Sequence, residues 1–377
     1  MASGPGQSRD RATIIDVAAA AGVSRQTVSN ALNNPDRVAP GTLMRVHREI
    51  ERLGFSPNAA AQQLRRRKAS AYGFEVNPSG AGKMGHILDG FLVELTVAAP
   101  DHSCHLVTFA PNLSRLLDGY DRILSTGLVD GFVLGDTRHD DPRPAWLLAN
   151  EVPFVTFGRI WDNPEMGRWV DVDGRAGMEV AVEHLVAQGY TAIAYLGWPD
   201  GSPVGDDRRR GWLSGLADAG LADTAIAEEA VQDLTVATAA AERLLDRLPS
   251  GGAILCASDL LALGALRAVR NHGLEPGRDV GVVGFDDSDV AEALQLTSLR
   301  QPLQDAAAEA WRIVHAKGTD LSLTALLAPT LTVRASTTPT PQSPNESPTQ
   351  SPNQSPVHPP RRPPLGRTAY PSLEEQQ

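Results

Sequence analysis

Four polar side chains near the N-terminus share one face of a short predicted helix, and their chemistry suits the edges of DNA bases. They are Arg25, Gln26, Ser29 and Asn30, within the segment TIIDVAAAAGVSRQTVSNALN that spans residues 13–33. An arginine fork matches guanine, and the amide of glutamine matches adenine. We therefore expect Arg25 and Gln26 to read bases, and all four side chains to hydrogen-bond to base edges or phosphates.

The flanking residues predict a helix-turn-helix that presents this face. Thr13 and Asp16 form a capping-box-like start, Gly22 supplies a sharp turn, and Ser24 caps the second helix. The inner faces of the two helices are apolar and comprise Val17, Ala18, Ala21, Val28 and Leu32. A helix pair with a purely structural role is the alternative interpretation.

The segment resembles the DNA-binding headpiece of the LacI/GalR family of bacterial transcription regulators. The resemblance rests on DVAAAAGVSRQTVSNALN, followed at the expected distance by GFSPNAAAQQL. It implies a sequence-specific, DNA-binding transcription regulator, and a repressor above all. Further polar side chains are interpreted as phosphate contacts, which fix register but carry no sequence information. These are Thr13, Ser24, Thr27 and Asn33.

The resemblance also implies a hinge helix after Pro57 and Asn58. In the family, this helix docks in the minor groove at the centre of a palindromic operator, where a leucine wedges between base steps. Leu64 matches that leucine, with Ala61 and Gln62 on the same insert. Unstacking a base step costs a few kcal/mol, which the contacts allowed by the bend offset. The alternative is an ordinary linker helix whose Leu64 packs on the body.

Charge is distributed unevenly along the 377 residues. The whole chain has a formal net charge of −11, yet residues 1–70 hold eleven Arg and Lys against five Asp and Glu. A basic headpiece on an acidic body suits docking on DNA through one end. No apolar run approaches the roughly twenty residues that span a bilayer, and residues 1–12 lack the apolar region of a secretory signal. We expect a cytoplasmic protein with no membrane partner.

Beyond the headpiece, short apolar runs alternate with amphipathic stretches. This alternation of buried strands with crossover helices predicts parallel α/β sheets, with too many strands for one compact unit. We expect a two-lobed, periplasmic-binding-protein-like body with a cleft between its lobes. The strand-like runs are AYGFEV, HLVTFA, VDGFVLG, VPFVTFG, AIAYLGW, GAILCAS and VGVVGFD. Cys104 and Cys256 lie in apolar runs and are interpreted as reduced core thiols.

The expected organisation has five parts. A tail rich in Ser-Pro has too few apolar residues to form a core and is expected to be disordered. Either an inert extension or a signalling role would suit it. The parts are a disordered arm (1–11), the headpiece (12–55), the hinge helix and linker (56–70), the effector-binding and dimerisation domain (71–336) and the tail (337–377). Within the domain, the first lobe takes about 71–168 and 301–319, and the second about 169–300 and 320–336.

The resemblance extends through GDDRRRGW, CASDLLALGAL and VGVVGFDDSDV and implies an effector site in the cleft. Open α/β sheets bind ligands at the carboxyl ends of their strands. The implied anchors are Arg208 and Asp286, which together suit the vicinal hydroxyls of a sugar. Alternatively, these two pair across the cleft or cap helices. Further candidates are Ser258, Asp259, Trp198 and Trp161 in this half, and Glu75 and Asn77 after the first strand.

The sequence gives no indication of a metal site or of a catalytic site. His102 with His105, and His139 with Asp140 and Asp141, lack metal-ligand spacing and are interpreted as loop residues. No phosphate-binding loop or nucleophile elbow is present, so neither catalysis nor a cofactor is expected.

Three classes of function remain. The first is a sugar-responsive repressor that binds operator DNA, or a regulator that responds to a purine or other metabolite. The others are a two-lobed solute-binding protein and an α/β enzyme with structural N-terminal helices. No leucine-heptad helix follows the body, which favours a homodimer.

Overall fold

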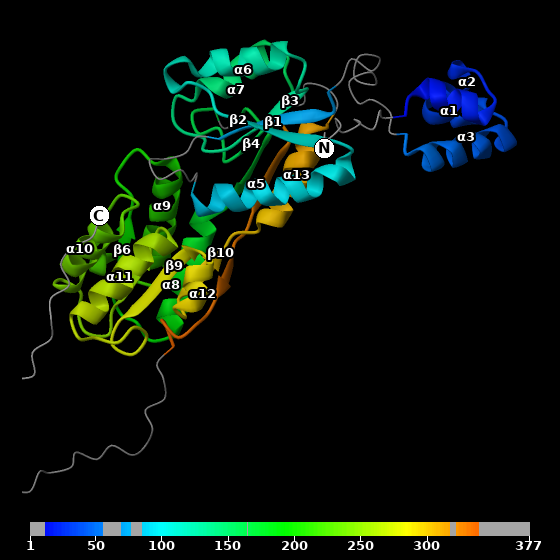
Figure 1. The fold of residues 1–377 in the computed structure, drawn as a ribbon. Helices are drawn as coiled ribbons and strands as arrows, with labels where there is room; N and C mark the ends of the chain where they lie inside the picture. Colours follow the sequence, from blue (N-terminus) through cyan, green and yellow to red (C-terminus); the bar gives the residue numbers. More distant parts are fainter. Residues whose placement is uncertain (1–11, 56–68, 77–84, 164, 317–321, 339–377) are drawn as a thin grey trace, which may run out of the picture. The chain divides into compact units, whose positions relative to one another are not determined.

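The structure is a computed structural model that describes residues 12–55, 69–76, 85–163, 165–316 and 322–338 (Figure 1). All structural statements below concern these residues. Within them the chain forms a three-helix headpiece and two α/β lobes, each around a sheet of its own. The expected fold class is confirmed, while the hinge helix falls outside the described residues.

The headpiece comprises α1 (Ile14–Ala21), α2 (Arg25–Asn33) and α3 (Pro40–Leu53). The Thr13 hydroxyl accepts a hydrogen bond from the Asp16 amide, and the Asp16 carboxylate accepts one from the Thr13 amide. Gly22 has φ +63°, a left-handed conformation that glycine adopts at low cost, and it lets the chain turn into α2. Val17, Val28 and Val46, one from each helix, are fully buried together.

The first lobe is built on six parallel strands in the order β11-β5-β4-β3-β1-β2. Its strands are β1 (Ala71–Glu75), β2 (His105–Phe109), β3 (Gly131–Leu134), β4 (Phe154–Phe157), β5 (Trp169–Val172) and β11 (Thr324–Leu327). Its helices are α5 (His86–Ala98), α6 (Leu116–Ser125), α7 (Pro142–Ala149) and α13 (Leu303–Val314). Figure 1 shows α13 (orange) beside α5 (cyan), and the Trp311 indole donates to the Leu95 carbonyl.

The second lobe has the strand order β12-β10-β9-β8-β6-β7, and only the β10–β12 pair is antiparallel. Its strands are β6 (Ile193–Gly197), β7 (Ala227–Glu229), β8 (Ala253–Cys256), β9 (Gly281–Asp286), β10 (Thr297–Arg300) and β12 (Thr330–Thr332). Its helices are α8 (Gly174–Ala187), α9 (Pro203–Asp218), α10 (Leu234–Leu245), α11 (Asp259–Asn271) and α12 (Asp289–Ala293). Helix α8 packs against α9, and α10 against α11.

The chain passes between the two sheets three times, and two of these passages correct the expected lobe boundaries. Strands β5 and β11 both pair in the first sheet, so residues 169–172 and 324–327 belong to the first lobe and not to the second. The sequence does not reveal these two strands because each is only four residues long and contains a polar residue, Asp171 in β5 and Thr324 in β11. The remaining passage, between β10 and α13, lies where it was expected.

The second lobe also extends beyond residue 336. Thr337 is fully buried, and its hydroxyl lies 2.8 Å from that of Thr297 and 2.9 Å from Nε2 of His184. The domain therefore includes Thr337, which the sequence assigned to the tail. Both cysteines are buried and free, as expected, and burial raises the pKa of the Cys104 thiol to about 11. No helix in the described part of the chain is long and apolar enough to cross a membrane.

Replacement of Thr13 by alanine is expected to destabilise α1 by about 1 kcal/mol, because it removes the hydroxyl from the N-cap. In the full chain, the amides of residues 14–21 should then exchange with deuterium roughly fivefold faster. Ile15→Ala is the control, since the Ile15 side chain is 62% exposed and makes no cap. Equal exchange in the two variants would contradict the capping role.

Candidate functional site

The outer face of α2 carries the side chains predicted to read DNA. Arg25 and Gln26 are exposed, and the Gln26 amide donates to Oδ1 of Asn30 at 3.2 Å. Ser24 caps the helix by accepting from the Thr27 amide at 3.1 Å. The structure therefore leaves Arg25 and Gln26 accessible on a capped helix.

Ser29 departs from this arrangement, because its residue is only 7% exposed. The expectation that it lies on the exposed face is wrong, because the residue is buried, as is Val28 before it. Thr13 is exposed at the N-cap of α1, and Asn33 is the last residue of α2. Asn58, Ala61, Gln62 and Leu64 lie outside the described residues.

A cavity of about 600 Å³ lies at the carboxyl ends of strands from both sheets. Its volume is within the usual range of small-molecule sites, about 300–1,000 Å³. The first lobe contributes Gly85–Leu88, Asp136, Thr137, Phe157, Gly158, Asp171 and Val172. The second contributes Trp198–Ser202, Val204, Arg208, Val231, Gln232 and Asp286, and Gln301 joins them from the passage after β10.

Arg208 is the buried cation of this cavity. It lies on α9, a helix that Ser202 caps and Pro203 begins, and the residue is only 5% exposed. Its guanidinium carbon lies 3.6 Å from the centroid of the Phe285 ring and 5.2 Å from that of Trp198. One terminal nitrogen donates to the carbonyl of Ala257. Burial lowers the pKa of Arg208, and the nearby carboxylate of Asp286 opposes this shift.

Asp286 is the carboxylate at the end of β9. Its backbone φ of 122° is rare for a non-glycine residue, so its surroundings must hold it there. The Gln301 amide donates to Oδ1 of Asp286 at 2.8 Å. Burial raises the pKa of Asp286 to about 7, although the charge of Arg208 acts in the opposite direction. The site thus places a buried cation near a carboxylate that titrates close to neutrality.

Three buried donors that line the cavity have no hydrogen-bond partner among the described residues. They are Nε of Arg208, Nε1 of Trp198 and the hydroxyl of Thr137. A buried donor without a partner costs free energy, so a ligand rich in hydroxyl oxygens would satisfy groups of this kind. Trp198 also offers an aromatic ring beside Arg208. These groups suit non-covalent binding of a polar molecule that has one apolar face.

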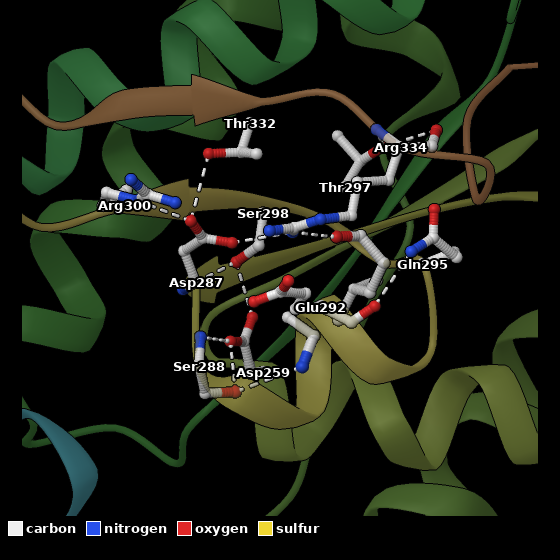
Figure 2. A network of polar contacts seen from close by, with 12 residues as sticks. Asp259, Asp287, Ser288, Glu292, Gln295, Thr297, Ser298, Arg300, Thr332 and Arg334 are labelled. Atoms are coloured by element: carbon white, nitrogen blue, oxygen red, sulfur yellow. Dashed lines mark hydrogen bonds and ion pairs between the residues drawn. The ribbon is translucent and has the colours of Figure 1, made fainter.

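Ser258 and Asp259 do not line the cavity, contrary to their prediction as effector ligands. Ser258 caps α11 and donates to Oε1 of Gln232 at 3.1 Å, so Gln232 lies between it and the cavity. Asp259 accepts from the amide and hydroxyl of Ser288, both at 2.7 Å, and from the hydroxyl of Ser298 at 2.6 Å (Figure 2). Its carboxylate therefore ties β10 to the start of α12.

Glu75 and Trp161 also lie away from the cavity lining. The Glu75 carboxylate is buried and accepts from the Tyr120 hydroxyl and from Arg143 at 2.9 Å. This is an internal charge pair that satisfies Glu75 within the first lobe. The Trp161 ring lies beneath the Arg159 guanidinium, 4.7 Å from its central carbon. Asn77 falls outside the described residues.

Several polar residues line the cavity although the sequence analysis did not identify them, and these lie at or just after the end of a strand. Asp136 and Thr137 follow β3, Asp171 lies in β5, and Gln301 follows β10. The rule that ligands bind at the carboxyl ends of parallel strands could have identified them. The ends of β5 and β10 are hard to locate in the sequence, because neither strand has a continuous apolar run. In the described part of the chain, no group of three or more His, Cys, Asp or Glu could hold a metal ion.

Comparison with known proteins agrees with both parts of this description. Residues 13–58 match the family described as bacterial regulatory proteins, lacI family, and residues 182–337 match a periplasmic binding protein-like domain. The chain is 35% identical over 308 residues to the HTH-type transcriptional regulator CelR of Thermobifida fusca, covering 79% of this chain and 89% of that regulator. It is 33% identical to AglR of Rhizobium meliloti over 338 residues, which cover 85% and 92% of the two chains.

Two solved structures show the same likeness. A complex of the transcriptional regulator CelR with cellobiose is 30% identical, with a TM-score of 0.63, covering 86% of this chain and all of that one. The lac repressor dimer bound to operator and the anti-inducer ONPF is 26% identical, with a TM-score of 0.72, covering 87% and 100%. The helix-turn-helix and the two-lobed body thus define a transcriptional regulator and not an enzyme. The chain belongs to the LacI/GalR family.

The pKa of Asp286 predicts how stability depends on pH. Because its folded pKa of about 7 exceeds its ordinary value of 3.8, the folded state binds the proton more tightly. The contribution is therefore fully present below about pH 4 and is lost as the pH rises through about 7. Chemical denaturation of wild type and Asp286→Asn should show this loss only in wild type, by at most about 4 kcal/mol. If the free energy of unfolding depends on pH in the same way in both proteins, the raised pKa of Asp286 is refuted.

Proposed function

We propose that the protein is a homodimeric, cytoplasmic repressor whose binding to a palindromic operator is controlled by a neutral sugar. The observation that carries the effector class is the cavity, where Arg208 and Asp286 lie beside the Trp198 ring at the strand ends. A planar fork and a carboxylate can bind vicinal hydroxyls, while an aromatic ring packs on the apolar face of a sugar. That a relative has been solved with cellobiose supports this class.

The charge of the cavity favours a neutral ligand over an anionic one. Its described lining has four carboxyl groups, which belong to Asp136, Asp171, Asp200 and Asp286, against the single arginine Arg208. Asp171 is paired with Arg159 and the pKa of Asp286 is about 7, so these groups are partly compensated, yet the described lining offers an anion no arginine or lysine other than Arg208. An anionic ligand would lose much of its solvation in the cavity, and Arg208, which already has the carboxyl group of Asp286 nearby, is the one arginine of the described lining that could compensate for this loss. We therefore infer that sugar phosphates and sugar acids bind more weakly than the neutral sugars.

On the DNA side, the proposal rests on α2 and on the basic N-terminal segment. Arg25 and Gln26 are exposed on the predicted reading helix. We also retain the proposals that Thr13, Ser24, Thr27, Asn30 and Asn33 contact DNA, and that Asn58, Ala61, Gln62 and Leu64 belong to a hinge that enters the minor groove. A dimer matches the two-fold symmetry of a palindromic operator.

The full chain should bind a palindromic duplex from its own upstream region with strong salt dependence. Raising the salt from about 50 to about 200 mM is expected to weaken binding by roughly 10³-fold or more, since the phosphate contacts release counterions. Arg25→Ala should weaken binding to the operator by about 1–3 kcal/mol while leaving random DNA nearly unaffected. Gel shifts on both duplexes provide the measurement. Equal losses on the two would show that Arg25 contacts phosphate only.

A neutral sugar should change operator affinity through a coupling free energy of about 1–3 kcal/mol. Calorimetry and gel shifts with cellobiose, maltose, glucose 6-phosphate and hypoxanthine would test the effector class, with a response to cellobiose or maltose expected. Arg208→Met should abolish the response, because it removes the buried fork, and should leave operator binding without sugar unchanged. If hypoxanthine alone changes operator affinity, the effector is a purine and not a sugar.

Two further variants make this test robust. Arg208→Lys keeps the charge near Asp286 and should still fold, yet it lacks the planar fork and should respond weakly. Arg243→Met removes an arginine that pairs with Glu228 at 2.9 Å on the surface of the second lobe, and it should respond normally. If Arg208→Lys responds like wild type, the fork has no part in sugar binding.

A further inference from the structure

One arginine joins the two lobes beside the cavity. Arg159 follows β4 of the first lobe, immediately after the lining residue Gly158. Its Nε donates to Asp171 at 2.7 Å, and its Nη2 donates to Asp207 at 2.7 Å. Asp171 lies in β5 of the first sheet, whereas Asp207 lies on α9 of the second lobe. A single guanidinium therefore bridges one carboxylate from each lobe.

Both carboxylates are tied to the candidate effector site. Asp171 lines the cavity, and it lies two residues before Asp173, the N-cap of α8, where the chain passes into the second lobe. Asp207 directly precedes Arg208 on α9 and also accepts from the backbone amide of Arg175 at 3.2 Å. Movement of α9 relative to β5 would therefore strain the ion bridge and displace Arg208 at the same time.

The surroundings make this bridge strong and directional. The side chains of Asp171 and Asp207 are only 11% and 6% exposed, and that of Arg159 is 25% exposed. Pairs this poorly solvated are screened little by salt, unlike ion pairs on the surface. The Trp161 ring covers the guanidinium at 4.7 Å and holds its plane, which leaves the two edges free for the two carboxylates.

We propose that Arg159 is a positioning residue that fixes the spacing of the two cavity walls and so preorganises the site for its effector. The inference rests on the proposed function in taking this cavity to be the effector site. Arg159 acts through Asp171 and Asp207, because it does not itself line the cavity. Ligand affinity depends on such preorganisation, since ordering the walls on binding would otherwise oppose association.

The first measurement needs no sugar. Hydrogen–deuterium exchange on the full chain compares wild type, Arg159→Met and Arg243→Met. In Arg159→Met, exchange should rise at least about fivefold in both residues 169–177 and residues 203–210, because β5 and the start of α9 lose their common anchor. Arg243→Met, which breaks an ion pair remote from the cavity, should leave both segments unchanged. Unchanged exchange in Arg159→Met would overturn the proposal.

The second measurement uses cellobiose as the probe. Arg159→Met should bind it at least about tenfold more weakly than wild type, while Arg243→Met binds normally. A double-mutant cycle with Asp207→Asn adds a readout that a merely structural role would not move. The effects of Arg159→Met and Asp207→Asn on affinity should be clearly less than additive, because both break the same bridge. Additive effects would overturn the proposal.

Two controls keep the outcomes separate. If wild type does not bind cellobiose, the proposed effector has failed, and the exchange of residues 169–177 and 203–210 alone decides the role of Arg159. If Arg159→Met does not fold, Arg159→Lys replaces it, because an ammonium group keeps the charge but cannot span both carboxylates in one plane. Wild-type exchange and affinity in Arg159→Lys would overturn the proposal.

Discussion

The buried charge of Arg208 is the constraint on which the rest of the site depends. A guanidinium removed from water must recover its solvation from the protein, and here it does so through the Ala257 carbonyl, the Phe285 ring and the nearby Asp286. Each of these groups lies at or just beyond the carboxyl end of β8 or β9, which fixes where α9 must pack. Burial raises the pKa of the nearby Asp286 carboxyl group, so the two buried groups are not fully compensated by their surroundings. A polar ligand entering the cavity would complete this compensation, and the same groups can therefore stabilise the fold and bind an effector.

Much of the fold could be predicted from the sequence because its signals are local. The capping residues Thr13 and Ser24 and the turn glycine Gly22 do in the structure what their types predict. Seven apolar runs correspond to the strands β1, β2, β3, β4, β6, β8 and β9. All of these except β2, which lies at a sheet edge, are inner strands, where burial on both faces demands continuous apolar sequence. Five strands were not predicted. They are three to four residues long, all five contain polar residues, and three of them (β7, β11 and β12) lie at sheet edges, where one side is unpaired and the apolar signal is weak.

The site was predicted less completely, since its polar residues depend on contacts between distant segments. Arg208 and Asp286 line the cavity, as the family resemblance implied, and so does Trp198, the candidate for stacking on a sugar. Asp259 has the residue type and strand-end position of a ligand, yet Ser288 and Ser298 occupy its carboxylate. Glu75 is likewise satisfied by Arg143, which is 68 residues away in the chain. No local sequence pattern distinguishes a carboxylate that is available to a ligand from one that is already paired within the protein. The difference depends on partners that come from distant segments of the chain.

The topology also limits how an event in the cavity can reach the rest of the molecule. The two sheets are joined by three passages of the chain, after β5, β10 and β11, and cavity residues lie beside two of them: Asp171 and Val172 at the end of β5, and Gln301 just after β10. A ligand that touches both walls must therefore favour one spacing of the lobes over others, because its contacts to the walls cannot all be kept when that spacing changes. Any partner whose binding depends on the same spacing is then linked to the ligand reciprocally, whichever of the two binds first. The sense of the response, release or recruitment, follows from which spacing each partner prefers and not from the identity of the contacts alone.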